Sequence, residues 1–523
     1  MDSALSQNRL LLFIICVTLF LVNQTCFALP DPLTINIEVV CDSTAVGDGG
    51  NVWGGHQCRI VRTCYGVFTA FTTEGKGYFE REWHVSQRTA DGWHEIAHDV
   101  AGREPVNLLA APDGTLHVIG WPGGKSTMWT ISPDSAGWNI QEQLVSGQSK
   151  GYWPYNSAGI DLTGNICILS SEGGEQPGGA FRWSYFQAAQ QKWTYRNSGL
   201  DFRYCYTYVF PNPPAGLSLV STRDVRWAAL GYQKPANASD YVFNAFRYWH
   251  ADSTLAPLAT KSFVEESPTT KFPNVVCNAQ KDAYIDTKGN VHVLYMKIGA
   301  STNGLVQHRH VVFAAAGDTL FDEICPANAG WYQCIFQDAK ANFFLLGDTG
   351  MLFLLDQNGF APVDSVLLDF QGYHVEYSGF GVSVPRTGTP LSDVVDVVFP
   401  TNGEKYWVYF SLQLDELFPN ASVEASGETL PAQFHLFQNY PNPFNSTTLI
   451  RYSLEKPAET CIQIFNLSGQ RVAKLAAGRQ SRGTYSVQWN GKNGAGQSVA
   501  TGLYFVRFEA DQFVTMKKAL FIR

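Results

Sequence analysis

The sequence of 523 residues has little charge, because only 16% of its residues are Asp, Glu, Lys or Arg. Long exposed helices need many Lys and Glu side chains, so this composition disfavours a helical protein. The formal net charge of −9 also lacks the basic excess with which proteins bind nucleic acid. Glycine is frequent, with 47 residues, and 14% of residues are aromatic. This excludes a disordered chain and favours many short strands joined by tight turns.

Common catalytic and metal-binding motifs are missing. The sequence holds no P-loop, no Gly-x-Gly-x-x-Gly after a strand, no Gly-x-Ser-x-Gly and no His-Glu-x-x-His, so nucleotide, α/β-hydrolase and zinc-protease functions lose their usual support. The cysteines form no Cys-x-x-Cys pair and indicate no disulfide framework, although Cys58 with Cys64, or Cys325 with Cys334, can pair after export. Two histidines alone, His308 and His310, are a weak metal signal. We expect no metal and no cofactor.

Only one long apolar run occurs, from Leu10 to Val22, directly after Arg9. It covers about 20 Å as a helix, which is too short to cross a membrane. Cys26 and Ala28 then supply small residues at −3 and −1 of a cleavage site. We predict that residues 1–28 are a secretory signal peptide, with an uncleaved anchor as the alternative, and that the mature chain has no integral membrane segment.

A strand–turn–strand pattern recurs along the next 380 or so residues, at intervals of about 50 to 70 residues. Each turn carries Gly, Asn or Asp, which tolerate positive φ and cap the turn locally. The turn positions are Gly66, Gly114, Gly164, Gly216, Gly289, Ala341 and Gly403. Further aromatic strands between these hairpins bring each unit to four strands. Units of this length and strand number are typical of a β-propeller.

We therefore predict an all-β fold: a seven-bladed β-propeller over residues 29–415, followed by a small Ig-like β-sandwich. Six or eight blades, or an irregular pair of sandwiches, are the alternatives. The segment SPDSAGW, residues 132–138, is similar to the Asp box of sialidase-like propellers, with two residues fewer between Gly and Trp. Arg59-Ile60-Val61 resembles the Arg-Ile-Pro that opens a sialidase first blade, without its Pro.

The C-terminal part differs in charge from the rest. Residues 430–523 contain 11 Lys or Arg and 4 Asp or Glu, a net of +7, which leaves −16 for residues 1–429. This asymmetry favours two separately built domains, joined by a linker over residues 416–429. In the tail, apolar side chains alternate at Ile462 and Ile464, and again at Tyr504, Val506 and Phe508. Such alternation predicts strands with one buried face.

The same tail strongly resembles the C-terminal sorting domain of type IX secretion cargo. The resemblance rests on FHLFQNYPNPFN (residues 434–445), IFNLSGQ (464–470), WNG (489–491), TGLYF (501–505) and MKK (516–518), in that order. Ser446 departs from the family, which usually has Pro there. The resemblance implies a bacterial protein exported through the periplasm and outer membrane, with the type IX translocon as partner. Such a protein is secreted or attached to the cell surface. A resident Ig-like module without a sorting role is the alternative.

In a propeller, the segments that lead into the innermost strands and the loops between second and third strands share one face. Arginines, carboxylates and aromatic residues gather in these segments. Arginine binds carboxylates in a bidentate fork, and Trp or Tyr rings cover sugar rings. Each residue also has a structural explanation, in ion pairs between blades or in core packing. The candidate ligand-binding residues are Arg59, Trp121, Tyr155, Glu172, Arg203, Tyr204, Arg223, Arg226 and Asp282.

This composition of one face predicts that the propeller binds or processes an extracellular glycan, and an anionic one in particular. Two alternatives remain open: a carbohydrate-active enzyme, either a polysaccharide lyase or a sialidase-like hydrolase, and a non-catalytic surface scaffold that binds or adheres to another protein. No catalytic residue can be named from the sequence.

Overall fold

The computed structural model describes most of the chain beyond residue 30. It describes residues 31–522 except 47–54, 78, 136, 146–154, 174–176, 213–215, 237, 239, 256–257, 266–277, 300, 303–304, 377–378, 402, 404, 420, 422–433, 437–438, 440–441, 443, 446, 455 and 481–482. The predicted signal peptide, residues 1–28, lies outside the described residues, as does most of the predicted linker, 416–429. The chain divides into two compact units, Met1–Val423 and Glu424–Arg523.

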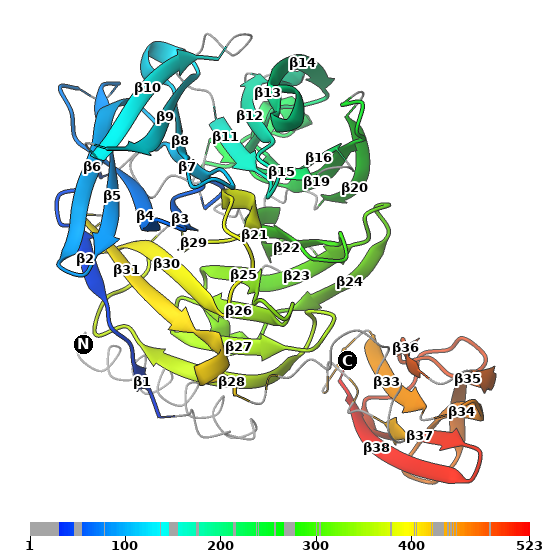
Figure 1. The fold of residues 1–523 in the computed structure, drawn as a ribbon. Helices are drawn as coiled ribbons and strands as arrows, with labels where there is room; N and C mark the ends of the chain where they lie inside the picture. Colours follow the sequence, from blue (N-terminus) through cyan, green and yellow to red (C-terminus); the bar gives the residue numbers. More distant parts are fainter. Residues whose placement is uncertain are drawn as a thin grey trace, which may run out of the picture. The chain divides into compact units, whose positions relative to one another are not determined.

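The first unit is a seven-bladed propeller, whose sheets lie around a common centre (Figure 1). The strands of the first four blades, from the innermost outward, are β3 (Ile60–Thr63), β4 (Gly66–Thr73), β5 (Arg81–Thr89) and β6 (Gly92–Gly102); β7 (Asn107–Ala110), β8 (Leu116–Gly120), β9 (Thr127–Asp134) and β10 (Gly137–Leu144); β11 (Tyr155–Ile160), β12 (Ile166–Gly173), β13 (Gly179–Gln187) and β14 (Lys192–Leu200); β15 (Tyr204–Asn212), β16 (Gly216–Arg223), β19 (Ala245–Ala251) and β20 (Ala259–Glu265).

The remaining three blades follow the same order of antiparallel strands, and the last one takes its outermost strand from the start of the chain. Their strands are β21 (Asn278–Ile285), β22 (Val291–Lys297), β23 (Gln307–Phe313) and β24 (Thr319–Ile324); β25 (Gln333–Gln337), β26 (Phe343–Gly347), β27 (Met351–Leu355) and β28 (Pro362–Asp369); β29 (Gly381–Val382), β30 (Val394–Thr401), β31 (Tyr406–Gln413) and β2 (Glu38–Cys41). The predicted fold class and blade number are therefore confirmed.

The ring is closed by the N-terminal segment. β2 pairs antiparallel with β31 in blade 7, and Thr44 then forms a bridge to Thr73 in blade 1. A two-residue strand, β1 (Leu33–Thr34), adds in parallel to the outer edge of blade 6. β2 thus becomes the outer strand of blade 7 and joins the last blade to the first through the N-terminal segment.

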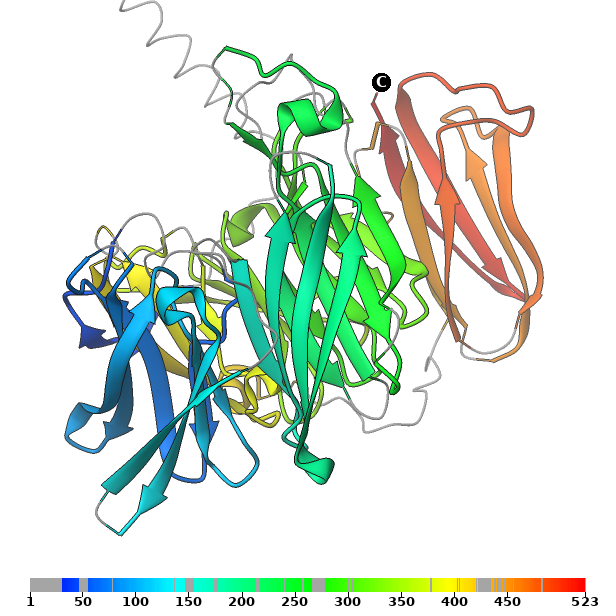
Figure 2. The same cartoon turned by 90° about the horizontal axis from the view of Figure 1, so that it is seen from above.

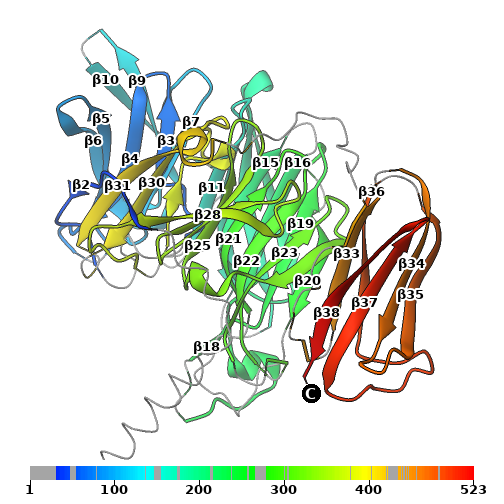
Figure 3. The same ribbon diagram turned by 90° about the horizontal axis from the view of Figure 1, so that it is seen from below.

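Six of the predicted turns join the first and second strands of blades 1 to 6. The seventh, at Gly403, joins β30 and β31, which are the second and third strands of blade 7. Its position differs because β29 has only two residues, and the connection from β29 to β30 is a longer segment that contains the 3₁₀ turn η5 (Pro385–Thr387). Figures 2 and 3 show the blades from the side.

The blades pack through large buried side chains. The ring centres of Trp83 in β5 and Trp129 in β9 lie 5.1 Å apart at the interface of blades 1 and 2. The described cysteines are free thiols. The other short elements are η1 (Pro122–Gly124), η2 (Ala188–Gln190), η4 (Ala327–Ala329) and α2 (Leu414–Leu417). No helix in the described part of the chain is long and apolar enough to span a membrane.

The second unit is a small sandwich of two antiparallel sheets. One sheet holds β32 (His435–Leu436), β33 (Thr448–Leu454) and β36 (Gly483–Trp489); the other holds β34 (Ala458–Phe465), β35 (Arg471–Gln480), β37 (Gly502–Ala510) and β38 (Phe513–Phe521). The alternating residues of β34 and β37 face its core, where Ile462, Ile464 and Phe508 are fully buried. The predicted strands with one buried face are therefore confirmed.

Candidate functional site

Blade 4 carries an insertion between β16 and β19 that extends one face of the propeller. It contains β17 (Val225–Arg226), η3 (Trp227–Leu230) and β18 (Tyr241–Val242), with β17 and β18 paired antiparallel. Figures 2 and 3 both show this insertion beyond the ends of the blade strands, and Figure 2 shows η2 at the opposite end. The side chains of Trp227 and Val242 are buried in one hydrophobic cluster, which gives the insertion a small core of its own.

Arg203, at the start of blade 4, lies between two tyrosines on this face. Its guanidinium carbon is 5.3 Å from the ring centre of Tyr155 and 5.0 Å from that of Tyr241. Its Nη2 atom lies 3.0 Å from Oδ2 of Asp224, and its Nε atom donates to the Asp224 carbonyl oxygen at 3.0 Å. Asp224 is 1% exposed, and burial raises the pKa of its carboxyl, an effect that Arg203 opposes. This pair fixes the arginine in place.

A second arginine approaches the same tyrosine. The guanidinium carbon of Arg226 lies 5.5 Å from the ring centre of Tyr241. The backbone pairing of Arg226 with Tyr241 across β17 and β18 produces this proximity. The structure therefore brings Arg203 and Arg226 to Tyr241, with Tyr155 also against Arg203, on the face where these segments were expected. Arg203, Tyr155, Arg226 and Tyr241 form what we call the blade-4 cluster.

Tyr206 lies beside the blade-4 cluster on a strained backbone. Its φ is +57°, a value that L-residues other than Gly rarely adopt, and it sits where the register of β15 against β16 shifts. The centre of its ring lies 5.2 Å from the ring centre of Tyr155, 5.7 Å from that of His56 and 6.0 Å from that of Phe243. Such strain persists only where the surroundings enforce it, and it is most frequent at binding and active sites.

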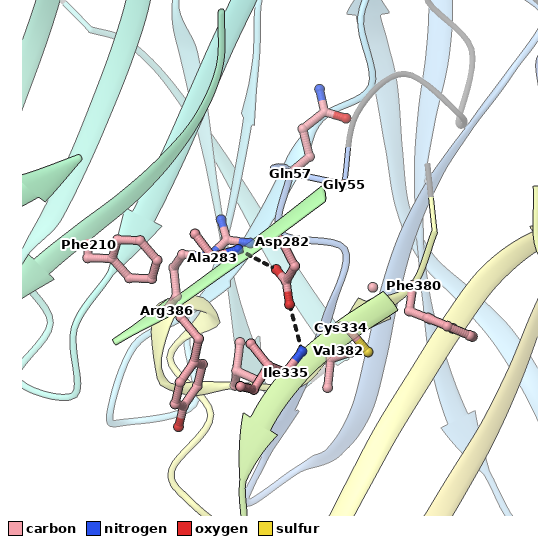
Figure 4. A pocket seen from close by; sticks show the side chains of 13 residues that line it. Gly55, Gln57, Phe210, Asp282, Ala283, Cys334, Ile335, Phe380, Val382 and Arg386 are labelled. Atoms are coloured by element: carbon pink, nitrogen blue, oxygen red, sulfur yellow. Dashed lines mark hydrogen bonds between the residues drawn. The ribbon is translucent and has the colours of Figure 1, made fainter. Parts of the chain in front are cut away.

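Side chains from several blades line a small cavity in the axial channel (Figure 4). Arg386 of η5 donates from Nη1 to the His56 carbonyl oxygen at 2.7 Å, and its guanidinium carbon lies 4.9 Å from the ring centre of Tyr208. The cavity that Gln57, Asp282 and Arg386 help to line has a volume of only ≈ 20 Å³. That is room for about one water molecule, so this cavity does not hold a sugar.

Asp282 is the carboxyl group that lines this cavity, beside Arg386. Its carboxylate accepts hydrogen bonds from the backbone amides of Ile335, at 2.9 Å, and Ala283, at 2.8 Å. Burial raises its pKa to about 7, against the opposing effects of these amides and of Arg386. Burial likewise lowers the pKa of nearby His56 to about 3, so that imidazole is neutral.

On the opposite side of Arg386 lies a wider hollow with a volume of ≈ 230 Å³. It is lined mainly by the ends of the innermost strands and their turns, from Ile160 to Thr163, Phe210 and Pro211, and Ile285. Pro385 and Arg386 form its remaining wall. Its lining is largely apolar, and it contains none of the residues that the sequence singled out.

The structure places the other predicted residues away from the blade-4 cluster. Arg59 is buried over Trp407 of blade 7, at 5.4 Å. Arg223 points into the outer part of blade 4, where its Nη2 atom binds Glu265 at 2.6 Å. Glu172 accepts from Arg182 at 2.7 Å. The aromatic residues Trp121 and Tyr204 are 4% and 0% exposed and pack in hydrophobic cores.

Several residues of this site were not among the sequence candidates. Asp224, Tyr241, Tyr206 and Arg386 hold or extend it. Two of them had a usable signal in the sequence: Asp224 stands between Arg223 and Arg226, and Tyr206 follows Arg203 and Tyr204, in segments already expected on this face. The role of Arg386 depends on a connection from blade 7 that reaches the inner strands of blades 2, 3 and 4.

Comparisons with known proteins identify the C-terminal unit only in part. Residues 443–512 match the FlgD Ig-like domain family. This match covers a small part of the chain, within the unit whose two sheets are described above. No sequence among the curated proteins matches the chain.

Solved structures of low similarity were also found. PorZ, an essential surface component of the type-IX secretion system of Porphyromonas gingivalis, is 12% identical with a TM-score of 0.37; the match covers 92% of this chain and 60% of PorZ. An α-L-arabinofuranosidase of Fusarium graminearum is 8% identical with a TM-score of 0.35, covering 60% of this chain and 93% of the enzyme. The periplasmic gluconolactonase of Pseudomonas aeruginosa is 10% identical with a TM-score of 0.36, covering 60% and 85%. At these values we base no functional argument on them.

Proposed function

We propose that this chain is an exported binding protein whose propeller takes an anionic glycan at the blade-4 cluster. The observation that carries the proposal is the stacking of two guanidinium groups, those of Arg203 and Arg226, on Tyr241. Guanidinium groups bind carboxylates and sulfates through paired hydrogen bonds, and tyrosine faces cover sugar rings. A rigid platform with both properties suits a uronate or another acidic sugar.

The platform is fixed before any ligand arrives. Arg203 is held by Asp224 and lies between two rings, so little side-chain entropy remains to be lost on binding. Its side chain is 12% exposed, whereas Tyr155, Arg226 and Tyr241 are half-buried and reach solvent. The accessible groups of the blade-4 cluster are therefore those that contact a ligand, and Asp224 is a positioning residue.

Binding fits this arrangement better than turnover. Glycoside cleavage needs a pair of carboxyl groups, or a free base, that reaches the substrate. The described carboxyl groups nearest the cluster are engaged: Asp224 binds Arg203, Glu104 accepts from the Asn156 amide at 3.2 Å, Glu172 binds Arg182, and the exposed Asp240 pairs with Lys234. Asp282 faces a cavity that holds about one water. A lyase or hydrolase function is therefore the less supported alternative.

We also propose that the C-terminal unit is a type IX sorting domain, preceded at the other end of the chain by a signal peptide over residues 1–28. The ordered motifs between Phe434 and Lys518 support the sorting role, and the unit has a core of its own around Trp489 and Phe508. A separately folded module at the chain end is what a translocon can recognise without disturbing the propeller. The protein would then be secreted or attached to the cell surface.

The glycan proposal is tested with the purified full chain on an array of uronate-containing, sialylated, sulfated and neutral oligosaccharides. We expect retention of acidic glycans only, and roughly 10- to 100-fold weaker binding for Arg226→Ala, since a charge-assisted hydrogen bond contributes about 1.5–3 kcal/mol. Arg309→Ala is the matched control, because Arg309 pairs with Asp322 in blade 5. Equal binding by Arg226→Ala and the wild type contradicts the proposal.

The two alternatives give other results in the same assay. Release of unsaturated uronate or of reducing ends during incubation identifies an enzyme. Retention of no glycan at all, together with capture of a protein partner at the same face, identifies a scaffold.

A further inference from the structure

A second polar cluster lies in blade 1, outside the blade-4 cluster and the axial channel. His84 of β5 and Glu95 and His98 of β6 bring their ligand atoms within 4.8 Å of one another. Both contacts involve the same carboxylate: Nδ1 of His84 lies 2.6 Å from one oxygen of Glu95, and Nδ1 of His98 lies 2.6 Å from the other.

A β-bulge produces this arrangement. Side chains three residues apart on a regular strand point to opposite faces of a sheet, so Glu95 and His98 would normally diverge. Here Val85 pairs with Ala97 and Ser86 pairs with Glu95, which leaves Ile96 as the extra residue. The bulge turns Glu95 to the face of His98, and His98 stands directly opposite His84. Bulges re-aim side chains in this way and are frequent next to functional sites.

His84 is fixed by contacts on its far side. Its Nε2 atom lies 2.8 Å from the hydroxyl of Thr73, and its ring stacks on Phe71 at 5.4 Å with an angle of 15° between the planes. A metal-binding histidine usually uses its second nitrogen for such an outer contact, which sets the tautomer and the ring orientation. The hydroxyl of Thr73 accepts from Nε2–H when Nδ1 carries the lone pair toward a metal.

From these observations we infer that His84, Glu95 and His98 bind a divalent transition-metal ion of the zinc type. Two imidazoles and one carboxylate favour Zn²⁺ and related ions over Ca²⁺ or Mg²⁺, which prefer oxygen ligands. Tetrahedral coordination at about 2.0–2.1 Å places ligand atoms roughly 3.3 Å apart, so each 2.6 Å contact has to open by less than about 1 Å.

The cluster is open to solvent on one side. The side chains of Glu95 and His98 are 43% and 62% exposed, so an ion can enter without rearrangement of the blade, and water or an external ligand completes its coordination.

The test uses the full chain, purified without a histidine tag and freed of metal with EDTA. Zn²⁺ is the probe, and binding is measured by isothermal titration calorimetry together with the melting temperature. We expect one ion per chain, a higher melting temperature with Zn²⁺, and no comparable effect of Ca²⁺. His98→Ala and Glu95→Gln are expected to weaken binding by at least roughly 10- to 100-fold, the loss seen when residues that only support the metal ligands are altered.

The controls separate this site from other histidines and thiols. His94→Ala alters an exposed histidine of the same strand outside the cluster, and Cys64→Ser removes an exposed thiol; both should bind as the wild type does. The side chain of His98 is exposed, so His98→Ala should fold normally. The melting temperature of this variant without metal verifies its folding. The inference is overturned if the wild type binds no Zn²⁺, or if His98→Ala and Glu95→Gln bind it as the wild type does. In either case the three residues form a hydrogen-bonded surface cluster only.

Discussion

Arg62 of blade 1 and Asp396 of blade 7 form a bidentate ion pair across the closure of the ring. Nε and Nη2 of Arg62 donate to the two carboxylate oxygens at 2.7 Å each, although the residues are 334 positions apart in the sequence. Asp396 is fully buried and also accepts from the Tyr409 hydroxyl at 2.8 Å. Together with β2 in blade 7, this pair connects the two ends of the propeller.

We predict that Arg62→Met destabilises the propeller by about 2–3 kcal/mol. The substitution leaves a buried carboxylate without its charged partner, which costs about 3–5 kcal/mol for a fully buried pair, and one third of the Arg62 side chain is exposed. Urea unfolding measures the loss. Arg182→Met removes a more exposed pair with Glu172 and should cost about 1 kcal/mol or less. Equal losses of stability in the two variants would show that the Arg62–Asp396 pair stabilises the propeller no more than an exposed ion pair does.

The closure also shows where prediction from sequence ends. The six inner turns of blades 1 to 6 were predictable, because five carry Gly at positive φ and the sixth keeps the flanking Asp338 and Asn342 around Ala341, whose φ is +62°. The pairing of β2 with β31 was not, because nothing in Glu38 to Cys41 indicates a partner some 370 residues away. Likewise nothing in Pro385 to Thr387 indicates that this segment leads Arg386 to the inner strands of blades 2, 3 and 4.

The candidate site divides along similar lines. The face was predictable from topology, since Tyr155, Arg203 and Arg226 all lie in segments that a propeller brings together. The direction of each side chain was not. Arg223 and Asp224 are neighbours in the sequence, yet the arginine turns to Glu265 and the aspartate to Arg203. A ligand role for the nine candidate residues stays a prediction.

The carboxyl of Asp282 makes stability depend on pH. A pKa raised to about 7 in the folded chain means that the folded state binds this proton more tightly than the unfolded state. The stabilisation is complete below pH 4 or so and is lost as the pH rises from about 4 to 7. Between pH 5 and 8 the wild type should therefore lose roughly 3 kcal/mol through this group, at 1.36 kcal/mol per pKa unit.

Asp282→Asn removes that dependence. We predict that the stability of Asp282→Asn relative to the wild type improves by roughly 3 kcal/mol between pH 5 and 8, as measured by urea unfolding at both values. Glu323, whose pKa is also raised to about 7 by burial, is present in both chains and cancels in the difference. A difference that stays constant with pH would mean that Asp282 does not titrate in this range.

Arg386 lines the small cavity in the axial channel, and we predict that Arg386→Met destabilises the fold by about 1.5–3 kcal/mol. The substitution removes a charged hydrogen bond to the His56 carbonyl and the contact with the Tyr208 ring. The loss should be larger at pH 8 than at pH 5, because Arg386 lowers the pKa of Asp282 and its removal leaves the ionised carboxylate without that stabilisation. Unfolding measurements at the two pH values test this, and an equal loss at both would argue against the coupling.

The ring of Tyr241 should contribute to glycan affinity by holding the guanidinium groups of Arg203 and Arg226 in place. We predict that Tyr241→Ala weakens binding of an acidic oligosaccharide by roughly 2- to 10-fold, because a stacked cation–aromatic contact contributes about 0.5–1.5 kcal/mol. Tyr241→Phe keeps the ring and should bind nearly as the wild type does. Tyr195→Ala, an exposed tyrosine of β14, is the control. Calorimetric titration measures all four chains, and equal affinity for Tyr241→Ala would exclude the ring from the site.

The sorting proposal makes a prediction about location. In a bacterium that has a type IX translocon, the full chain should reach the cell surface or the medium, whereas a chain that ends at residue 429 should stay in the periplasm. The propeller should still fold without the tail, because the two units are separately compact and Trp489 and Phe508 belong to a core of the second unit alone. Immunoblots of cell fractions measure the location, and protease resistance of the retained propeller verifies its folding.

The double variant Lys517→Ala, Lys518→Ala should reduce export without unfolding the C-terminal unit, because neither side chain is buried. Lys492→Ala is the control on the same unit. Release of the truncated chain into the medium at the level of the full chain would leave the C-terminal sandwich as a resident module with no part in export.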